Sequence, residues 1–145
     1  MTSRTHTRAF TLIEILIVVV ILGILAAIVI PQFSALTGDA QAKTTYSEVQ
    51  KLRRHLGVFK ARNSNNLPNV LPGNGTWGEL VAVGGEYLLE PPVNQWVGGN
   101  NSHVIVLGNT PDTTFHTNYG WIYDPATGDV WAASFDAADH PLPRP

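Results

Sequence analysis

Side chains suited to chemistry are few in this chain of 145 residues, and their spacing is uninformative. There is no cysteine, which excludes disulfides, thiolate metal sites and thiol catalysis. The five histidines show no paired metal-ligand spacing. The glycines at 73, 75 and 78 lack the lysine and helix that a phosphate-binding loop needs, and no serine stands in the context of an activated nucleophile. An enzyme is therefore not expected.

One carboxylate stands out because it lies in an apolar segment. Glu14 is the only charged residue between Phe10 and Ile30. A charge at the centre of a membrane helix costs roughly 2.5–3.5 kcal/mol on insertion scales, and less near an end. Two interpretations stay open: Glu14 snorkels to the interface, or it pairs with an opposite charge. Cleavage before Phe10 would create such a partner, an α-amino group, either one turn away or on a neighbouring, staggered chain.

The apolar segment is long enough to cross a bilayer. With a rise of about 1.5 Å per residue, residues 10–30 form a helix of roughly 32 Å, and a hydrocarbon core is about 30 Å thick. A secretory signal has a shorter apolar region and a small-residue cleavage site, for which Ala26-Ala27 is a poor match. Arg4 and Arg8 precede the segment, so the positive-inside rule predicts a cytoplasmic N-terminus and an exported C-terminal part.

A second, amphipathic helix segment is predicted for residues 32–62. Spacings of three and four place six residues on one face: Ala42, Thr45, Val49, Leu52, Leu56 and Phe59. Pro31 separates the two segments and predicts that the helix kinks or stops there, because proline lacks an N–H group and clashes with the preceding turn.

Charge is divided between two parts of the chain. Residues 43–62 carry six basic side chains and one acidic one, whereas residues 63–145 carry eight acidic side chains and one basic one. The two parts are either solvated surfaces of opposite sign or complementary surfaces of neighbouring copies, which would set their register more than their affinity. The basic part has no interleaved aromatic residues, so we expect no nucleic-acid partner.

Residues 63–145 predict a small domain with an antiparallel sheet. Asparagine, proline and glycine predict a loop over 63–76, and a short helix is predicted over 77–83, ending at Gly84-Gly85. β-Branched and aromatic runs predict three strands, at residues 102–107, 119–123 and 129–135. The turn sequence of residues 124–128 predicts that the last two form a hairpin.

A helix packed on such a sheet is an α+β fold. Two tryptophans, Trp121 and Trp131, are expected in its core, whereas Trp96 is the best candidate for an exposed aromatic binding surface.

Residues 9–14, Ala-Phe-Thr-Leu-Ile-Glu, resemble the cleavage and methylation motif of type IV prepilins and type II secretion pseudopilins. The resemblance continues through the apolar run to Pro31, where that family often has a kinking proline. Ala9 departs from it, because the family usually has Gly there. The resemblance implies that a prepilin peptidase cuts between Ala9 and Phe10 and N-methylates Phe10, and that Glu14 acts in assembly.

The resemblance also implies a division of the chain and a pilin-like, lollipop-shaped subunit. We expect a cleavable leader at 1–9, a transmembrane and assembly helix at 10–31, an amphipathic stem at 32–62 and a globular periplasmic head at 63–145. The order of elements in the head, with the segment Glu90-Pro91-Pro92-Val93-Asn94 after a short helix, looks like the major pseudopilin of type II secretion.

That pseudopilin has an acidic calcium-binding loop near its C-terminus. The candidates for such a loop here are Asp124, Asp129, Asp136 and Asp139. Their spacing does not match a calcium loop and Asp124 has a turn role, which leaves Asp136 and Asp139 as calcium candidates. Otherwise no cofactor is expected.

The function implied is that of a structural subunit of a type II secretion pseudopilus or a type IV pilus. It would reside in the bacterial inner membrane before it joins a filament. Its expected partners are copies of itself, other pilins or pseudopilins, the prepilin peptidase, the inner-membrane assembly platform and membrane lipid. The alternatives are a minor tip pilin for adhesion or DNA uptake, and a membrane-tethered periplasmic enzyme. The acidic head argues against DNA, and no catalytic residue set supports the enzyme.

Overall fold

The computed structural model describes residues 10–73, 75–81 and 86–145, without the side chains of residues 34 and 35. The predicted leader, with Arg4, Arg8 and Ala9, and the predicted helix end at Gly84-Gly85 lie outside the described residues. The chain divides into two compact units between Thr37 and Gly38.

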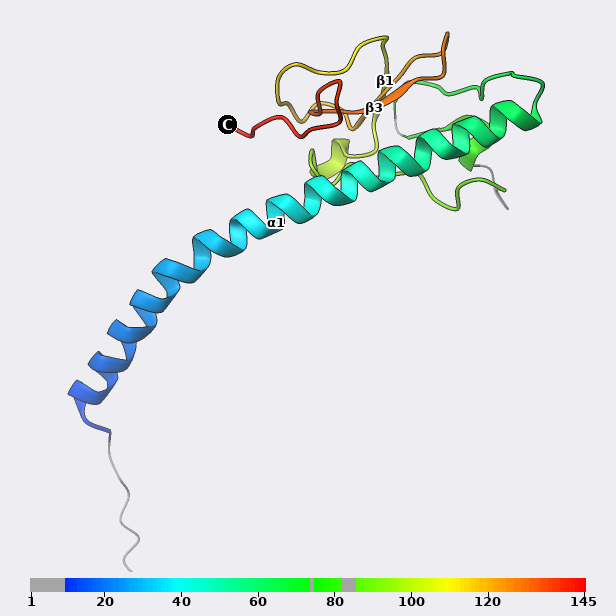
Figure 1. Cartoon of the computed structure of the whole chain (residues 1–145). Helices are drawn as coiled ribbons and strands as arrows, with labels where there is room; N and C mark the ends of the chain where they lie inside the picture. Colours follow the sequence, from blue (N-terminus) through cyan, green and yellow to red (C-terminus); the bar gives the residue numbers. More distant parts are fainter. Residues whose placement is uncertain (1–9, 74, 82–85) are drawn as a thin grey trace, which may run out of the picture. The chain divides into compact units, whose positions relative to one another are not determined.

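A single helix, α1 (Leu12–Arg62), contains both predicted helical segments (Figure 1). Pro31 lies inside it, so the helix does not stop at the proline, which was one of the two expected outcomes. Proline removes one hydrogen bond without preventing the next turn from forming, and membrane helices tolerate it. The kink at Pro31 and the predicted domain boundaries stay predictions.

In the first unit the apolar part of α1 is exposed on all sides. Every side chain from Phe10 to Phe33 is exposed. A helix that is apolar all round needs an apolar environment, since only a minority face of it could be covered by one small domain. By length and composition, α1 can cross a membrane.

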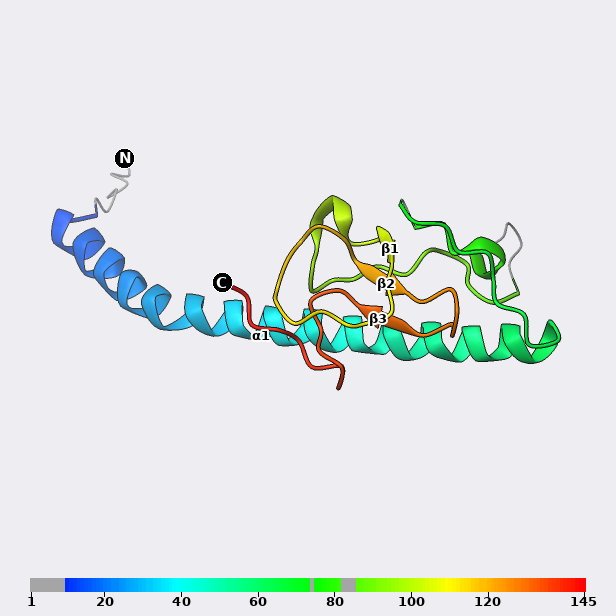
Figure 2. The same ribbon diagram turned by 90° about the horizontal axis from the view of Figure 1, so that it is seen from above.

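The second unit, residues 38–145, joins the rest of α1 to short elements. These are the 3-10 helices η1 (Gly78–Val81) and η2 (Gly99–Asn101) and the strands β1 (Ile105–Leu107), β2 (Trp121–Tyr123) and β3 (Val130–Ala132). Figures 1 and 2 show the strands alongside the cyan and green part of α1. The architecture is α+β and pilin-like, as predicted.

The three strands form a mixed sheet in the order β1-β2-β3. β2 and β3 are antiparallel, with Ile122 opposite Trp131, which confirms the predicted hairpin. β1 is parallel to β2, with Val106 opposite Ile122, so the expectation of a wholly antiparallel sheet was wrong on this side. Parallel pairing needs a crossover of roughly a dozen residues or more, and the segment 108–120 supplies it.

The hairpin turn uses the residues that its sequence indicated. The N–H of Gly128 donates to the carbonyl of Asp124 at 2.8 Å, and the Asp124 carboxylate accepts from the N–H of Ala126 at 2.8 Å. Gly128 has a φ of 82°, a conformation that side chains disfavour, and a Cβ there would lie 2.4 Å from Leu67 Cδ2.

The predicted face of the helix is confirmed as one wall of the core. Thr45, Val49, Leu52, Leu56 and Phe59 are buried, and Ala42 packs against them. The opposite wall includes three aromatic residues: Trp77, Trp121 and Tyr123. The Trp77 ring lies edge-on to both of the others, with centroids 6.1 Å apart.

Several elements are shorter or tighter than predicted. The short helix of residues 77–83 is described as the 3-10 helix η1, where Gly78 has a φ of 55°. The first strand begins at Ile105 rather than Ser102, because Ser102 caps η2 by donating its hydroxyl to the Gly99 carbonyl at 2.8 Å.

Trp96 is half-buried, so it does not offer the open aromatic surface that was expected. Its ring lies edge-on to Phe115 and Phe135. The Arg144 guanidinium lies 4.0 Å from its ring centroid and donates to the Trp96 carbonyl at 2.6 Å and to Gln41 Oε1 at 2.8 Å. The end of the chain thus closes over Trp96 and reaches α1.

Asn94 is a buried polar side chain that joins three segments. Its Nδ2 donates to the carbonyls of Gly120 at 2.8 Å and Ala133 at 3.0 Å, which flank β2 and β3. Its Oδ1 accepts from the Thr45 hydroxyl of α1 at 3.3 Å and from the N–H of Val97 at 3.0 Å. The amide therefore uses both its hydrogens and accepts two bonds, as a fully buried amide must.

We expect Asn94→Ala to lower the free energy of unfolding by about 2–4 kcal/mol, because two buried carbonyls and a hydroxyl lose their partner. Asn100→Ala, at an exposed position of η2, should stay within about 0.5 kcal/mol of the parent. Thermal unfolding of the full chain in detergent, followed by tryptophan fluorescence, measures both. Equal midpoints for the two variants would contradict the role given to Asn94.

The raised pKa values of Tyr123 and Tyr119 predict that the folded domain loses stability in alkali. Burial, and then the charges of Asp124 and Glu79, raise the pKa of Tyr123 to about 12. Burial and the hydrogen bond to Asp112 raise the pKa of Tyr119 to about 12 as well. An unfolded tyrosine titrates near pH 10, so the folded state binds more protons above that pH. Stability present below pH 10 should therefore fall between pH 10 and 12.

Tyr123→Phe should flatten this fall and change little at pH 7, because the Tyr123 hydroxyl has no hydrogen-bond partner among the described residues. Tyr46→Phe, at an exposed ring, is the control and should keep the full slope. Unfolding midpoints measured from pH 7 to 12 compare the variants. A Tyr123→Phe slope equal to that of the parent would show that Tyr123 does not titrate as described.

Candidate functional site

The first turn of α1 places Glu14 against Thr11. The N–H and the hydroxyl of Thr11 each donate to Glu14 Oε2 at 2.7 Å. The Glu14 N–H approaches Thr11 Oγ1 at 3.3 Å, so the two residues cap each other. This is a capping box, in which a Thr before the helix and a Glu three residues later satisfy each other's backbone groups. The Thr-x-x-Glu spacing is visible in the sequence, but the capping box was not predicted from it.

The capping box lowers the energetic cost of placing the Glu14 carboxylate in apolar surroundings. Two donors from Thr11 bind one carboxylate oxygen, and the positive end of the helix favours a negative charge there. The net charge remains. Local capping thus lowers the cost of placing Glu14 in an apolar medium but leaves a charge that an opposite one would stabilise further.

The predicted partner of that charge is an α-amino group at Phe10, either of the same chain or of a neighbouring one. Phe10 directly precedes Thr11 and its side chain is 79% exposed. Its nitrogen belongs to the peptide bond with Ala9, and only cleavage at that bond would turn it into an ammonium group. Ala9 itself lies outside the described residues.

The two calcium candidates have partners inside the chain. Asp139 forms a two-point ion pair with Arg53, in which Nη2 donates to Oδ1 at 2.9 Å and Nη1 pairs with Oδ2. Asp136 Oδ1 accepts the N–H groups of His140 at 2.9 Å and Ala138 at 2.8 Å, which lower the pKa of Asp136. In the part of the chain that the structure describes, no three acidic or histidine side chains gather as a metal site would require.

Arg53 also holds the hairpin. Its Nε and Nη2 donate to the Val130 carbonyl at 3.1 and 2.9 Å, so one guanidinium joins α1 to the start of β3 and to Asp139. The sequence had assigned the basic residues of 43–62 either to solvent or to a neighbouring copy. For Arg53 neither alternative holds, because its partner lies 86 positions away in the same chain.

We expect Asp139→Asn to lower the free energy of unfolding by about 1–3 kcal/mol, since a partly buried, two-point charged contact is lost. Asp129→Asn, at an exposed turn position, is the matched control with a smaller effect. Thermal unfolding at low salt and in about 1 M NaCl, where the Debye length falls to roughly 3 Å, gives both values. An Asp139 variant as stable as the Asp129 variant would remove the structural role of this ion pair.

The N-terminal segment of the chain matches a known family profile. A family profile described as "Prokaryotic N-terminal methylation motif" matches residues 4–30. The chain is 40% identical over 61 residues to the type II secretion system core protein G of Pseudomonas aeruginosa, which is 42% of this chain and 43% of that protein. It is 33% identical over 63 residues to the Escherichia coli protein of the same name, 43% of each chain.

A fimbrial protein of Pseudomonas aeruginosa is 52% identical over 46 residues, which is 32% of this chain and 30% of that protein. The matched segments thus span less than half the length of these relatives. No solved structure matches the chain. The chain therefore carries a prepilin-type methylation motif on a pilin-like α+β architecture, and it is homologous over part of its length to type II secretion core protein G and to fimbrial protein.

Proposed function

We propose that this chain is a structural, non-catalytic subunit of a type II secretion pseudopilus or a type IV pilus. A prepilin peptidase cuts it between Ala9 and Phe10 and methylates the new N-terminus, and residues 10–30 then enter the core of a filament. The observation that carries this proposal is the apolar part of α1, exposed on all sides with a single acidic residue in its first turn, in the segment that the methylation motif matches.

The apolar surface suits two environments equally. Lipid tails and the side chains of neighbouring helices are both apolar, so moving from bilayer to helix bundle changes the hydrophobic free energy little. The term that differs is electrostatic, because an ammonium group at Phe10 of one copy can neutralise Glu14 of another. An opposite charge in a medium of low dielectric stabilises the bundle at one register of the helices.

The proposed location follows from the same helix. The subunit lies in the inner membrane with its N-terminus in the cytoplasm and residues 38–145 in the periplasm. Its partners are copies of itself, other pilins or pseudopilins, the peptidase, the assembly platform and lipid. We propose no cofactor, since the Asp139 carboxylate is neutralised by Arg53 and that of Asp136 closes a turn.

Mass spectrometry of the mature protein tests the proposed processing. We expect a chain that begins with N-methylated Phe10. An intact Met1, or a cut after Ala27, would contradict the proposal.

Glu14→Ala should be cut and remain in the membrane, but the yield of sheared filaments should fall by at least about tenfold, the effect of some 1.4 kcal/mol per subunit. Asp39→Ala, which removes an exposed acidic residue of the same helix outside the motif, is the control and should assemble normally. Normal filament yield from Glu14→Ala would remove the assembly role of Glu14 and leave the processing result standing.

A further inference from the structure

Some basic residues of the stem, residues 32–62, form ion pairs within the chain, whereas others are exposed and form none with any described residue. Lys51 pairs with Glu48 at 3.3 Å, Arg53 with Asp139, and Arg62 with Glu86. Among the described residues, Lys43 and Arg54 form no ion pair and no side-chain hydrogen bond, and both are exposed. They lie on the side of α1 opposite the sheet, on a stripe that also contains Ser47 and Val58.

This stripe, defined by Lys43, Ser47, Arg54 and Val58, is an unpartnered basic surface. Its members recur at spacings of four and seven, which keeps them on one face of the helix. Val58 is 39% exposed and lies one turn from Arg54, so the stripe offers an apolar side chain directly beside a free positive charge.

The other part of the second unit carries a matching surface of opposite sign. Glu90 is exposed and forms no ion pair with any described residue. The side chain next to it, Leu89, is 91% exposed, so the head presents an apolar side chain directly beside a free negative charge. We call Leu89 and Glu90 the acidic rim.

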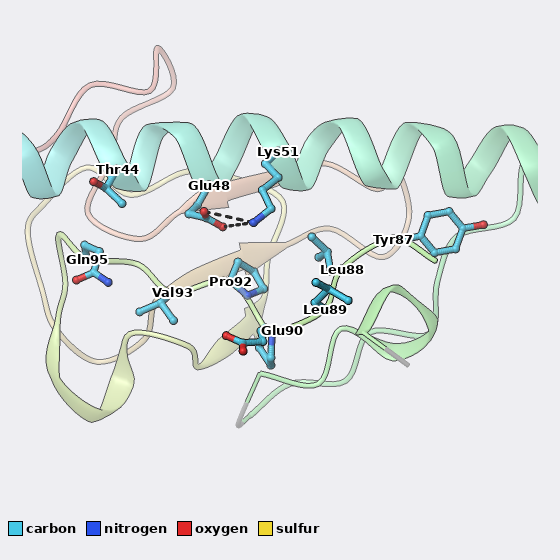
Figure 3. A pocket seen from close by; sticks show the side chains of 11 residues that line it. Thr44, Glu48, Lys51, Tyr87, Leu88, Leu89, Glu90, Pro92, Val93 and Gln95 are labelled. Atoms are coloured by element: carbon cyan, nitrogen blue, oxygen red, sulfur yellow. Dashed lines mark hydrogen bonds and ion pairs between the residues drawn. The ribbon is translucent and has the colours of Figure 1, made fainter. Parts of the chain in front are cut away.

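The acidic rim borders a groove between α1 and residues 87–95, shown in Figure 3. The groove has a volume of about 470 Å³. Glu48 and Lys51 project into it from the helix, and Leu88 and Pro92 lie on the other side. The rim is therefore supported on a fixed segment, because Asn94 anchors the end of that segment in the core.

We propose that the basic stripe of one copy docks on the acidic rim of a second copy, with Arg54 against Glu90 and Val58 against Leu89. The proposal rests on the proposed function and names a contact between the stem of one copy and the head of the next, outside the helix bundle. Charge selects the occupant: stem against stem would bring basic residues together, and head against head would bring acidic ones together. Stem against head is the arrangement of two copies that pairs opposite charges.

The contact has a consequence for how copies add. The stripe and the rim are different surfaces, so an array of copies keeps one stripe free at one end and one rim free at the other. Such a heterologous contact extends without limit when its rotation does not close a ring, which is what a filament requires.

Disulfide cross-linking in the full chain tests the contact, and the lack of native cysteine makes it specific. Arg54→Cys and Glu90→Cys are combined in one chain, which is expressed with its secretion or pilus system and oxidised in intact cells. We expect a ladder of dimers, trimers and longer species on a non-reducing gel. Each single variant should give at most dimers, and Arg54→Cys combined with Asp129→Cys should give no ladder.

A charge exchange tests the same contact without a covalent bond. Glu90→Arg should lower the yield of sheared filaments at least about tenfold, since it places like charges opposite each other at the contact. Adding Arg54→Glu to that chain should restore most of the yield, because every copy again meets an opposite charge. Asp129→Arg, an exposed acidic residue away from the rim, should leave the yield unchanged.

The outcomes separate the contact from the function on which it rests. Filaments with N-methylated Phe10 but no ladder, and no rescue by the charge exchange, would overturn the contact and leave the proposed function intact. A parent chain that forms no filaments and keeps Met1 would overturn both the contact and the proposed function. A ladder limited to dimers even for the double variant would also overturn the contact, because it would indicate a closed, two-fold arrangement.

Discussion

The second unit depends on a single buried amide. Three-residue strands and loops without regular structure make few backbone hydrogen bonds of their own, so the sheet cannot fix its place against α1 by its ladder alone. Asn94 supplies what is missing by bonding to the helix and to the backbone of both chain segments at the open end of the hairpin. Arg53 adds a second tie, from the helix to the start of β3. Asn94 and Arg53 thus hold the sheet in place against α1. In larger sheets, long strands with many backbone hydrogen bonds serve this purpose.

How much could be predicted depended on the range of the interactions involved. The buried face of α1 follows from spacings of three and four between Ala42 and Phe59, and the hairpin follows from its turn residues. The parallel pairing of β1 was missed because a three-residue strand carries no mark of direction, and the long segment 108–120 is what decides it. Trp96 is covered in part by Phe115, Phe135 and Arg144, which no local pattern connects to it.

In the candidate site, too, the local motif was visible in the sequence and the long-range contacts were not. The motif at residues 9–14 was visible at once, but the mutual capping of Thr11 and Glu14 was overlooked although its spacing is local. The roles of Arg53 and Asp139 could not be predicted, since a contact across 86 positions has no signature in composition or periodicity. Net charge divided the chain correctly into a basic and an acidic part. Only the structure tells which of those charges are already paired.

The contact of Arg144 with Gln41 and Trp96 bears on the order in which the domain can form. Arg144 is the penultimate residue, and Gln41 lies 103 positions earlier in the chain. Contacts of such sequence separation close late and slow folding, because a long loop must lose its freedom before they stabilise anything. The core face of α1 is synthesised well before Arg144, so this contact closes only after most of residues 38–145 have been made.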